Sequence, residues 1–219
     1  MDNLLKLIFP PKCIVCENYG SLLCENCLKK CRKLRRHYEL QLPPPHPSLD
    51  VFYYFVYEQT IRECIRHAKY LKKQFAVLRE ISKIAVSDML SRDVSFSADY
   101  VVPIPLSLKK KRYRGFNQAK VISNVISKAY LIPHQNSILT RQKNTRSQHR
   151  LNKKERMKNI KGAFKVSFDI SGKKILLVDD ICTTGATLTE SARVLYNAGA
   201  AKVSAFTLSK MLKNQSSFS

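Results

Sequence analysis

Residues 173–188 read Lys173-Lys174-Ile175-Leu176-Leu177-Val178-Asp179-Asp180-Ile181-Cys182-Thr183-Thr184-Gly185-Ala186-Thr187-Leu188. The apolar run 175–178 is typical of a strand that is buried on both faces of a parallel sheet. Two carboxylates follow it, and then a turn of small residues. Leu188, Ala192 and Leu195 continue at helical spacing. This order predicts an α/β fold with a ligand site where the strand ends.

The turn Thr183-Thr184-Gly185-Ala186-Thr187 has the composition of a phosphate cradle. Backbone N–H groups at a helix N-terminus, together with the helix dipole, favour a phosphate, and the threonine hydroxyls add donors. Asp179 and Asp180 can accept hydrogen bonds from ribose hydroxyls. The alternative is an ordinary turn in which Asp180 and Thr184 only cap the helix. A Walker A loop is excluded because no Gly-Lys-Ser/Thr follows, so the pattern favours a phosphosugar.

The segment resembles the PRPP-binding motif of type I phosphoribosyltransferases, and other segments extend the resemblance. These are Asp99-Tyr100-Val101-Val102-Pro103-Ile104-Pro105-Leu106, Arg112-Tyr113-Arg114-Gly115-Phe116-Asn117-Gln118-Ala119, Leu139-Thr140-Arg141, the single residues Thr145, Gln148, Arg156 and Asn159, and Gly162-Ala163-Phe164. In order and content they resemble the ComF family of competence proteins (ComFC or GntX-like) over nearly the whole chain. The resemblance implies a type I phosphoribosyltransferase-like parallel sheet flanked by helices, a small zinc-binding N-terminal segment and a role in natural transformation. In that role the protein would help bring single-stranded DNA into the cytoplasm.

The resemblance also implies how PRPP would bind. Asp179 and Asp180 would hold the ribose, residues 183–187 would hold the 5′-phosphate, and the loop after Pro105 would meet the Mg²⁺-chelated pyrophosphate. Asp179, Asp180 and Arg141 are the catalytic candidates. Cations considered for the pyrophosphate or for DNA are Lys109, Lys110, Lys111, Arg112, Arg114, Arg146 and Arg150. Each of these has the alternative of being a solvated surface charge.

Four of the seven cysteines form two close pairs, Cys13 with Cys16 and Cys24 with Cys27. Two such pairs can close a tetrahedral Zn²⁺ site. A disulfide framework is the alternative, and a reducing compartment disfavours it. We expect Cys31 to be a spare thiol and Cys64 to be a core residue. Cys182 lies in the phosphate loop, where the helix dipole could lower its pKa, and it receives no catalytic role.

The chain of 219 residues is strongly basic, with 39 Lys and Arg, 16 Asp and Glu, and a net charge of +23. Between positions 107 and 165 there are seventeen Lys and Arg but one acid, Glu155. Such charge predicts a polyanionic partner, either nucleic acid, here single-stranded DNA, or an anionic membrane face. The alternatives are a generally basic proteome and charge that serves only solubility. Five aromatic residues could stack bases or pack in the core: Tyr53, Tyr54, Tyr57, Tyr113 and Phe116.

Proline clustering at 42–48 suggests a linker between two domains. We expect a four-cysteine zinc-finger segment at 1–42 and a phosphoribosyltransferase-like domain at 51–219, divided into a hood at 51–98 and a PRPP-binding core at 99–219. Expected strands are 51–57, one from 101, 138–141, 162–168, 175–179 and 202–208. Expected helices cover 61–68, 75–85, 115–130 and 188–199, and 141–161 reads as a mobile loop or weak helix.

The sequence shows no secretory signal and no transmembrane stretch. We therefore expect no stable membrane insertion and a cytoplasmic location, with peripheral contact to the inner membrane as an alternative. Three functions stay open. The first is a competence protein that binds single-stranded DNA and PRPP with Mg²⁺. The second is an active phosphoribosyltransferase on an unknown acceptor. The third is a basic, zinc-containing scaffold that docks on a helicase or another DNA-processing partner.

Overall fold

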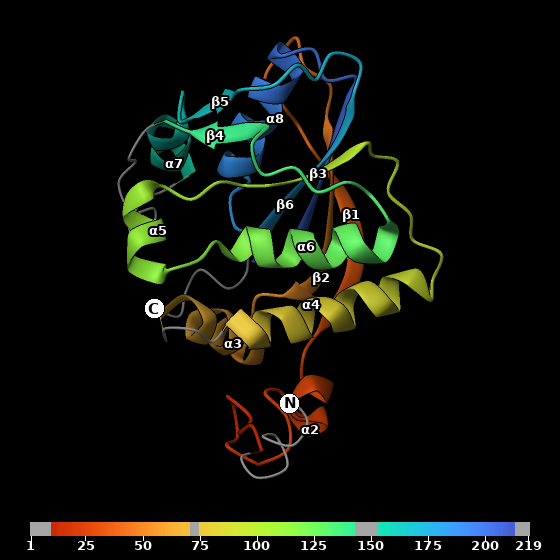
Figure 1. Ribbon diagram of the computed structural model, residues 1–219, viewed down its shortest axis with the longest axis vertical. Coiled ribbons are helices and arrows are strands. Elements are labelled where there is room, and N and C mark those ends of the chain that lie inside the picture. Colours follow the sequence, from red (N-terminus) through yellow and green to blue (C-terminus); the bar gives the residue numbers. More distant parts are fainter. Residues whose placement is uncertain (1–9, 71–74, 143–152, 213–219) are drawn as a thin grey trace.

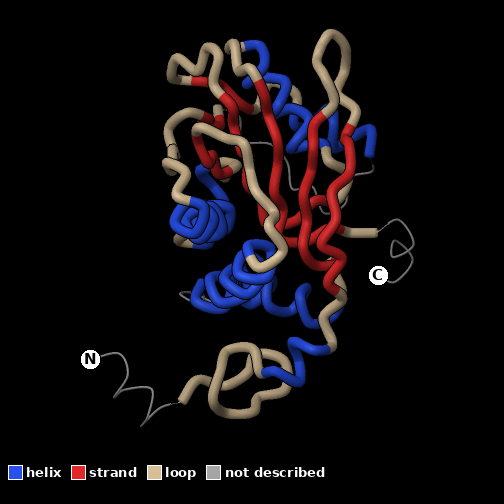
Figure 2. The backbone as a smooth tube through the Cα atoms, turned by 90° about the vertical axis from the view of Figure 1, so that its right-hand side faces the viewer, coloured by secondary structure: helices blue, strands red, loops and turns tan. Residues whose placement is uncertain are grey.

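A five-stranded sheet forms the centre of the computed structural model, which describes residues 10–70, 75–142 and 153–212. The strand order is β1-β2-β7-β6-β3 (Figures 1 and 2). The strands are β1 (Lys33–Leu40), β2 (Leu49–Val56), β3 (Tyr100–Pro103), β6 (Lys174–Cys182) and β7 (Lys202–Lys210). β2, β7, β6 and β3 pair in parallel, whereas β1 pairs antiparallel with β2 at one edge. The sheet confirms the α/β prediction.

β6 shows why the fold takes this form. Ile175 and Leu177 lie in the apolar cluster on one face of the sheet, and Leu176 and Val178 lie in the cluster on the other face. All four side chains are buried. A strand of this kind needs helices over both faces, and the crossovers between parallel strands supply them.

Helices cover both faces of the sheet, as Figure 2 shows. One face carries α3 (Gln59–Tyr70), α4 (Phe75–Leu90) and α6 (Gln118–Tyr130), and the other carries α8 (Ala186–Asn197). At the periphery lie α2 (Glu25–Lys29), α5 (Leu108–Arg114) and α7 (Lys153–Ile160). β4 (Leu139–Arg141) and β5 (Phe164–Val166) form a separate two-stranded antiparallel sheet. The expected strand at 162–168 is therefore shorter than predicted and lies outside the main sheet.

Among the described strands, β1 is the one that the sequence did not predict. Its register places Tyr38 opposite Val51 and Leu40 opposite Leu49. The proline-rich residues 42–48 thus connect two strands of one sheet, and their assignment as a linker between domains is wrong. The N-terminal segment and the main sheet are joined by a strand that belongs to the sheet itself.

The stretch after β3 also differs from the prediction. Residues 108–114 form α5 rather than a loop, with the Ser107 hydroxyl accepting from the backbone N–H of Lys110. Gly115 ends α5 at φ 76°, and Asn117 then caps α6, so the predicted helix 115–130 begins later. Of the stretch 141–161, residues 153–160 form α7, while 143–152 lie outside the described residues.

The cysteine-containing segment packs on the side of the sheet that carries α3, α4 and α6. Cys13, Leu23 and Cys27 share one buried cluster with Cys64 and Ile65 of α3. This confirms Cys64 as a core residue. Among the residues that the structure describes, no helix combines the length and the hydropathy that crossing a bilayer would need.

Candidate phosphosugar site

The acidic pair and the small-residue turn lie at the carboxyl end of β6, beside the loop that follows β3. β6 is longer than predicted and runs through both aspartates to Cys182. A cavity of about 400 Å³ opens there. It brings together all the residues that the sequence assigned to PRPP, namely Asp179, Asp180, Thr183, Thr184, Gly185, Ala186 and Thr187, and it adds Arg141. The loop residues Pro105 and Leu106 form another part of its wall.

Asp180 is held by a lysine from a distant helix. Lys69 Nζ, at the end of α3, lies 2.6 Å from Asp180 Oδ2, and the two side chains are only 15% and 12% exposed. Burial works to raise the pKa of Asp180, but the Lys69 ammonium, with smaller contributions from Arg114 and Asp179, outweighs it and lowers that pKa. Asp180 is therefore a buried carboxylate that keeps its charge.

Asp179 has the opposite electrostatics. Its Oδ1 accepts a hydrogen bond from the backbone N–H of Asp180 at 2.9 Å. Burial, followed by the negative charge of Asp180, raises the pKa of Asp179. The pair thus consists of one carboxylate and one carboxyl group that binds a proton readily, a combination that can both accept from and donate to ribose hydroxyls.

The turn leads into α8 in a form that suits an anion. Gly185 occupies the N-cap position at φ 78° and offers no side chain that could cap the helix. Thr184 Oγ1 accepts only a long 3.4 Å hydrogen bond from the Ala186 N–H. Of the alternative in which Asp180 and Thr184 cap the helix, only this weak Thr184 bond is present among the described residues, and Asp180 pairs with Lys69 instead. The first-turn N–H groups of α8 and the helix dipole therefore face the cavity.

Cations surround this cavity in excess of its two acids. The lining includes Arg66, Lys69, Lys110, Arg114, Arg141 and Arg156. Arg156 Nη1 donates to Thr183 Oγ1 at 2.9 Å. Burial and then the charge of Arg114 lower the pKa of Lys110, and burial lowers the pKa of Arg141. Burial is the largest cause of both shifts, and at Lys110 the charges of Arg114, Arg141 and Lys69 add to it. An anionic ligand would offset these neighbouring positive charges.

The lysines and arginines considered for the pyrophosphate or for DNA do not all line one site. Lys110 and Arg114 line the cavity, Lys111 lines a neighbouring groove, and Lys109 and Arg112 are exposed and line neither. Arg146 and Arg150 lie outside the described residues.

The aromatic candidates for base stacking divide as well. Tyr53 and Tyr54 are buried, so their alternative of core packing is correct. Tyr57 and Phe116 are half-buried. Tyr113 is 68% exposed and projects from the basic helix α5.

Sequence reasoning missed the residues that α3 contributes, namely Arg66, Lys69 and Tyr70. The periodicity of Ile61, Ile65 and Ala68 indicated a helix, but nothing in the sequence showed which element it would face. Arg156 belonged to the segments of the family resemblance without an assigned role, so that resemblance was the signal that could have found it.

The surroundings of Cys182 contradict the expectation that the helix dipole lowers its pKa. It ends β6, is buried, and its Sγ lies 3.1 Å from the Tyr38 hydroxyl of β1. Burial raises the pKa of Cys182 and outweighs the groups that lower it. The thiol is therefore a structural contact between β1 and the turn.

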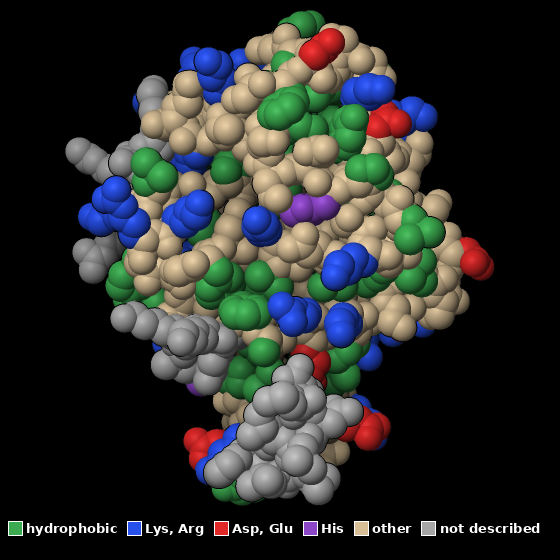
Figure 3. Space-filling view, in the orientation of Figure 1, with side chains coloured by type: hydrophobic (Ala, Val, Ile, Leu, Met, Phe, Trp, Pro, Cys, Tyr) green, Lys and Arg blue, Asp and Glu red, His purple; other side chains and the backbone are tan. Residues whose placement is uncertain are grey.

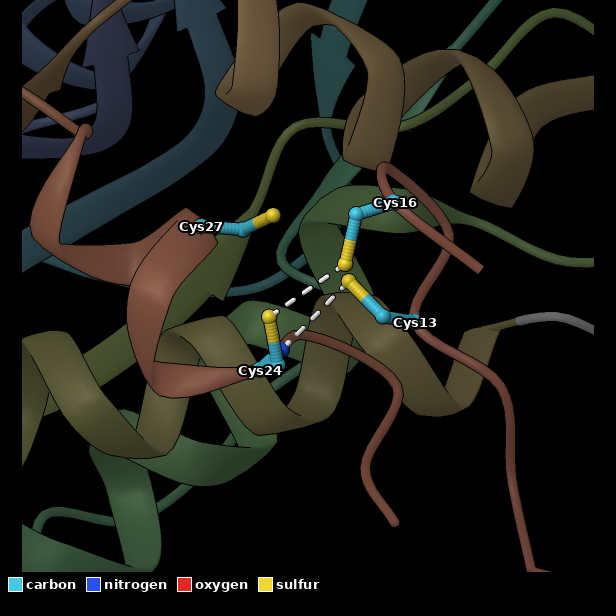
Figure 4. Close-up of side chains that lie close together, drawn as sticks. All are labelled: Cys13, Cys16, Cys24 and Cys27. Atoms are coloured by element: carbon cyan, nitrogen blue, oxygen red, sulfur yellow. Dashed lines mark hydrogen bonds between the residues drawn. The ribbon is translucent and has the colours of Figure 1, made fainter. Parts of the chain in front are cut away.

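The four paired cysteines converge, as Figure 4 shows. Their Sγ atoms all lie within 4.8 Å of one another, with 3.5 Å between Cys16 and Cys24. A tetrahedral Zn–S shell at 2.3 Å requires sulfur atoms about 3.8 Å apart, so the cluster fits a metal ion of this kind.

The protonation of the cysteines agrees with that fit. Burial works to raise the pKa of Cys13, but backbone N–H groups, first that of Cys24, lower it to about 6. Burial and the neighbouring thiols raise the pKa of Cys27. Thiols this close cannot all ionise unless a cation joins them.

Comparison with known proteins agrees with the geometry of the site. The phosphoribosyl transferase domain family matches residues 68–216, which include both aspartates, the turn and Lys69. The chain belongs to this family. It is 27% identical over 205 residues to DNA utilization protein YhgH of Escherichia coli, covering 92% of this chain and 84% of that protein.

Two further relatives of this chain are named as competence proteins. Competence protein F of Haemophilus influenzae is 27% identical over 198 residues, covering 88% of this chain and 80% of that protein. Competence protein ComFC of Streptococcus pneumoniae is 29% identical over 203 residues, covering 88% and 82%. These matches confirm the resemblance to the ComF family.

Proposed function

We propose that this protein binds PRPP with Mg²⁺ in the cavity at the carboxyl end of β6. The observation that carries the proposal is that two aspartates, a helix N-terminus with a glycine at its N-cap, and six cations line one cavity. The aspartates suit the ribose hydroxyls and the turn suits the 5′-phosphate. The residues after β3, with Lys110 and Arg114, suit the pyrophosphate, whose charge Mg²⁺ would partly neutralise.

Titration calorimetry with PRPP and Mg²⁺ tests the proposal. We expect binding by the wild type and a ten- to hundredfold weaker affinity for Asp180→Asn, because a charged hydrogen-bond acceptor is lost. Asp169→Asn is the matched control, since Asp169 is exposed and lies outside the cavity. Absence of binding at millimolar PRPP would refute the site, and equal losses in the two variants would refute the role of Asp180.

The same cavity supports phosphoribosyl transfer as a second candidate. The raised pKa of Asp179 places a carboxyl that can carry a proton beside the proposed ribose position. Release of pyrophosphate from PRPP, with single-stranded DNA present or absent, measures turnover. Binding without release would leave PRPP as a ligand or regulator.

We further propose that the protein serves competence by handling single-stranded DNA, as the names of its relatives suggest. The specific observation is α5, where exposed Lys109 and Arg112 flank the exposed ring of Tyr113. Cations and a free aromatic face are the two elements of a sequence-tolerant single-strand site. We also propose that the four-cysteine cluster holds Zn²⁺ and that the protein docks on a helicase or another DNA-processing partner.

A salt titration with a dT20 oligonucleotide tests the DNA site. We expect affinity to fall with salt at a log–log slope of about −0.7 per contacted phosphate. Lys109→Glu with Arg112→Glu should weaken binding and flatten the slope, and Tyr113→Ala should weaken it at unchanged slope. The matched control is Lys29→Glu with Lys30→Glu, two exposed cations on the cysteine segment. Equal effects of the two charge reversals would contradict a site on α5.

A further inference from the structure

A second and larger hollow lies between α4 and α6, on the face of the sheet that also carries α3. Its volume is about 1410 Å³. Its floor is apolar and is formed mainly by Phe75, Val86, Leu90, Phe116, Val121, Val125 and Ala129. Figure 3 shows this face, with hydrophobic side chains gathered between Lys and Arg side chains. Soluble proteins rarely leave such a surface open without a partner.

The two helices present regular stripes to this groove. α6 contributes Val121, Val125 and Ala129, one turn apart, and all three are half-buried. α4 contributes positions 75, 79, 83, 86, 87 and 90, which also share one face. Side chains spaced by one turn form ridges, and another helix can pack its own ridges into the grooves between them. α6 has 13 residues, so a helix of about 20 Å would match its length.

The rims of the groove carry charge of one sign. Arg79 and Lys83 lie along α4, Lys120 and Lys128 lie along α6, and all four are exposed. Lys111 and Arg141 complete the set, and no Asp or Glu is among the described residues that line the groove. An occupant with acidic flanks would therefore be complementary, whereas a second copy of this chain, at +23, would be repelled.

The floor suits aliphatic side chains better than nucleic-acid bases. The Arg79 guanidinium covers the ring of Phe75 at 5.3 Å, and Phe116 packs against the same ring at 5.8 Å and 56°. Among the described residues, the two aromatic rings of the groove therefore already pack against other groups, whereas single-strand sites need open rings. Valine and leucine dominate the rest of the floor.

We propose that this groove docks an acidic amphipathic helix of a partner protein. The apolar face of that helix would cover the floor, and its Asp and Glu would meet the cations of the two rims. Pro105, Leu106 and Arg141 line both the groove and the phosphosugar cavity. The partner would therefore lie directly beside the proposed PRPP site, although the inference does not depend on PRPP binding.

Fluorescence anisotropy on the full-length chain tests the proposal. The probe is a labelled 18-residue synthetic helix with Leu at i, i+3, i+4 and i+7 and with Glu on its other face. A scrambled peptide of the same composition keeps the charge but lacks the apolar face. We expect the amphipathic peptide to bind at least tenfold more tightly than the scrambled one.

Variants then place the binding in the groove. Val125→Lys and, on the other helix, Leu90→Lys should each weaken peptide binding at least tenfold, because each puts a charge on the apolar floor. Leu131→Lys is the matched control, since it adds the same charge at a position that is 89% exposed and outside the groove. It should change affinity less than twofold. Equal thermal unfolding midpoints establish that the variants fold.

Three outcomes would overturn the proposal. The first is equal binding of the amphipathic and scrambled peptides, which means nonspecific charge attraction. The second is effects of Val125→Lys and Leu90→Lys no larger than that of Leu131→Lys. The third is displacement of the peptide by dT20 together with tighter dT20 binding to Val125→Lys than to Leu131→Lys, which would assign the groove to nucleic acid.

Discussion

Lys69 Nζ and Asp180 Oδ2 lie 2.6 Å apart and join the end of α3 to the phosphosugar turn. The acid pair therefore has a cation from the protein before any ligand arrives. A ribose bound by these aspartates would meet one carboxylate that Lys69 neutralises, and binding would require less reorganisation of charge. The pair also links the helical layer to the strand that carries the site.

Removing only the lysine should be more damaging than removing both charges. Lys69→Met leaves Asp180 buried without its counter-ion, and breaking such a pair costs about 3–5 kcal/mol in the free energy of unfolding. Adding Asp180→Asn removes the orphan charge and should recover part of the loss. Urea unfolding of the wild type, both single variants and the double variant measures this coupling. Additive losses would contradict it.

Asp179 should make stability depend on pH. Its pKa is raised in the folded state, so its contribution to stability is full below the unfolded pKa of about 3.9 and is lost as pH rises through the raised value. Asp179→Asn removes this titration. Between pH 5 and 9 the wild-type melting temperature should therefore fall relative to that of Asp179→Asn.

The control for this experiment is Asp169→Asn. Asp169 is exposed, and its pKa is lowered by the backbone N–H of Ser171, so above pH 5 it stays ionised. The control should run parallel to the wild type over the same range. Parallel curves for Asp179→Asn as well would show that the Asp179 carboxyl does not titrate there.

A side chain at Gly185 should be destabilising for two reasons, and a second glycine separates them. It has φ 78°, and a Cβ there would lie 2.9 Å from Leu40 Cδ2 of β1. Gly172 has φ 71° with nothing within 4 Å of its Cβ position. Gly172→Ala should cost only the left-handed strain of about 1–2 kcal/mol. Gly185→Ala should cost about 1 kcal/mol more because of overpacking, and it should also weaken PRPP binding. Chemical denaturation of both variants makes the comparison.

The cysteine cluster should hold about one Zn²⁺ per chain, because four thiolates close one tetrahedral shell. Cys27→Ser should release the metal and lower the melting temperature, since Cys27 also belongs to the apolar cluster under α3. Cys31→Ser changes a buried thiol four residues away and should keep the metal. Elemental analysis of reduced protein decides. Equal zinc content in both variants would contradict the assignment.

Local sequence patterns predicted the fold correctly where the residues are buried. The run 175–178 predicted a two-faced strand because each of its side chains meets apolar neighbours in the sheet. β1 was not predicted because its sequence is rich in Lys and Arg and its side chains are exposed or half-buried. Its extended conformation comes from pairing with β2, a tertiary effect that overrides local propensity.

The site was predictable to the extent that it lies in one segment. The turn 183–187 and both aspartates could be read directly, because they follow one strand. Lys69 could not, because its position depends on how α3 packs against the sheet. The lysines and arginines of 109–114 were separated by the formation of α5, since a helix turns neighbouring residues to different sides.

The shared core of the cysteine segment and α3 bears on how the protein can be dissected. Cys13, Leu23 and Cys27 cover apolar side chains that include Ile61, Cys64 and Ile65. A truncated chain that starts at β2 would expose those side chains to water and would also lose the edge strand that contacts the turn through Leu40. Exchanging the cysteine segment between relatives would therefore require matching changes along α3, so the two parts are expected to vary together during evolution.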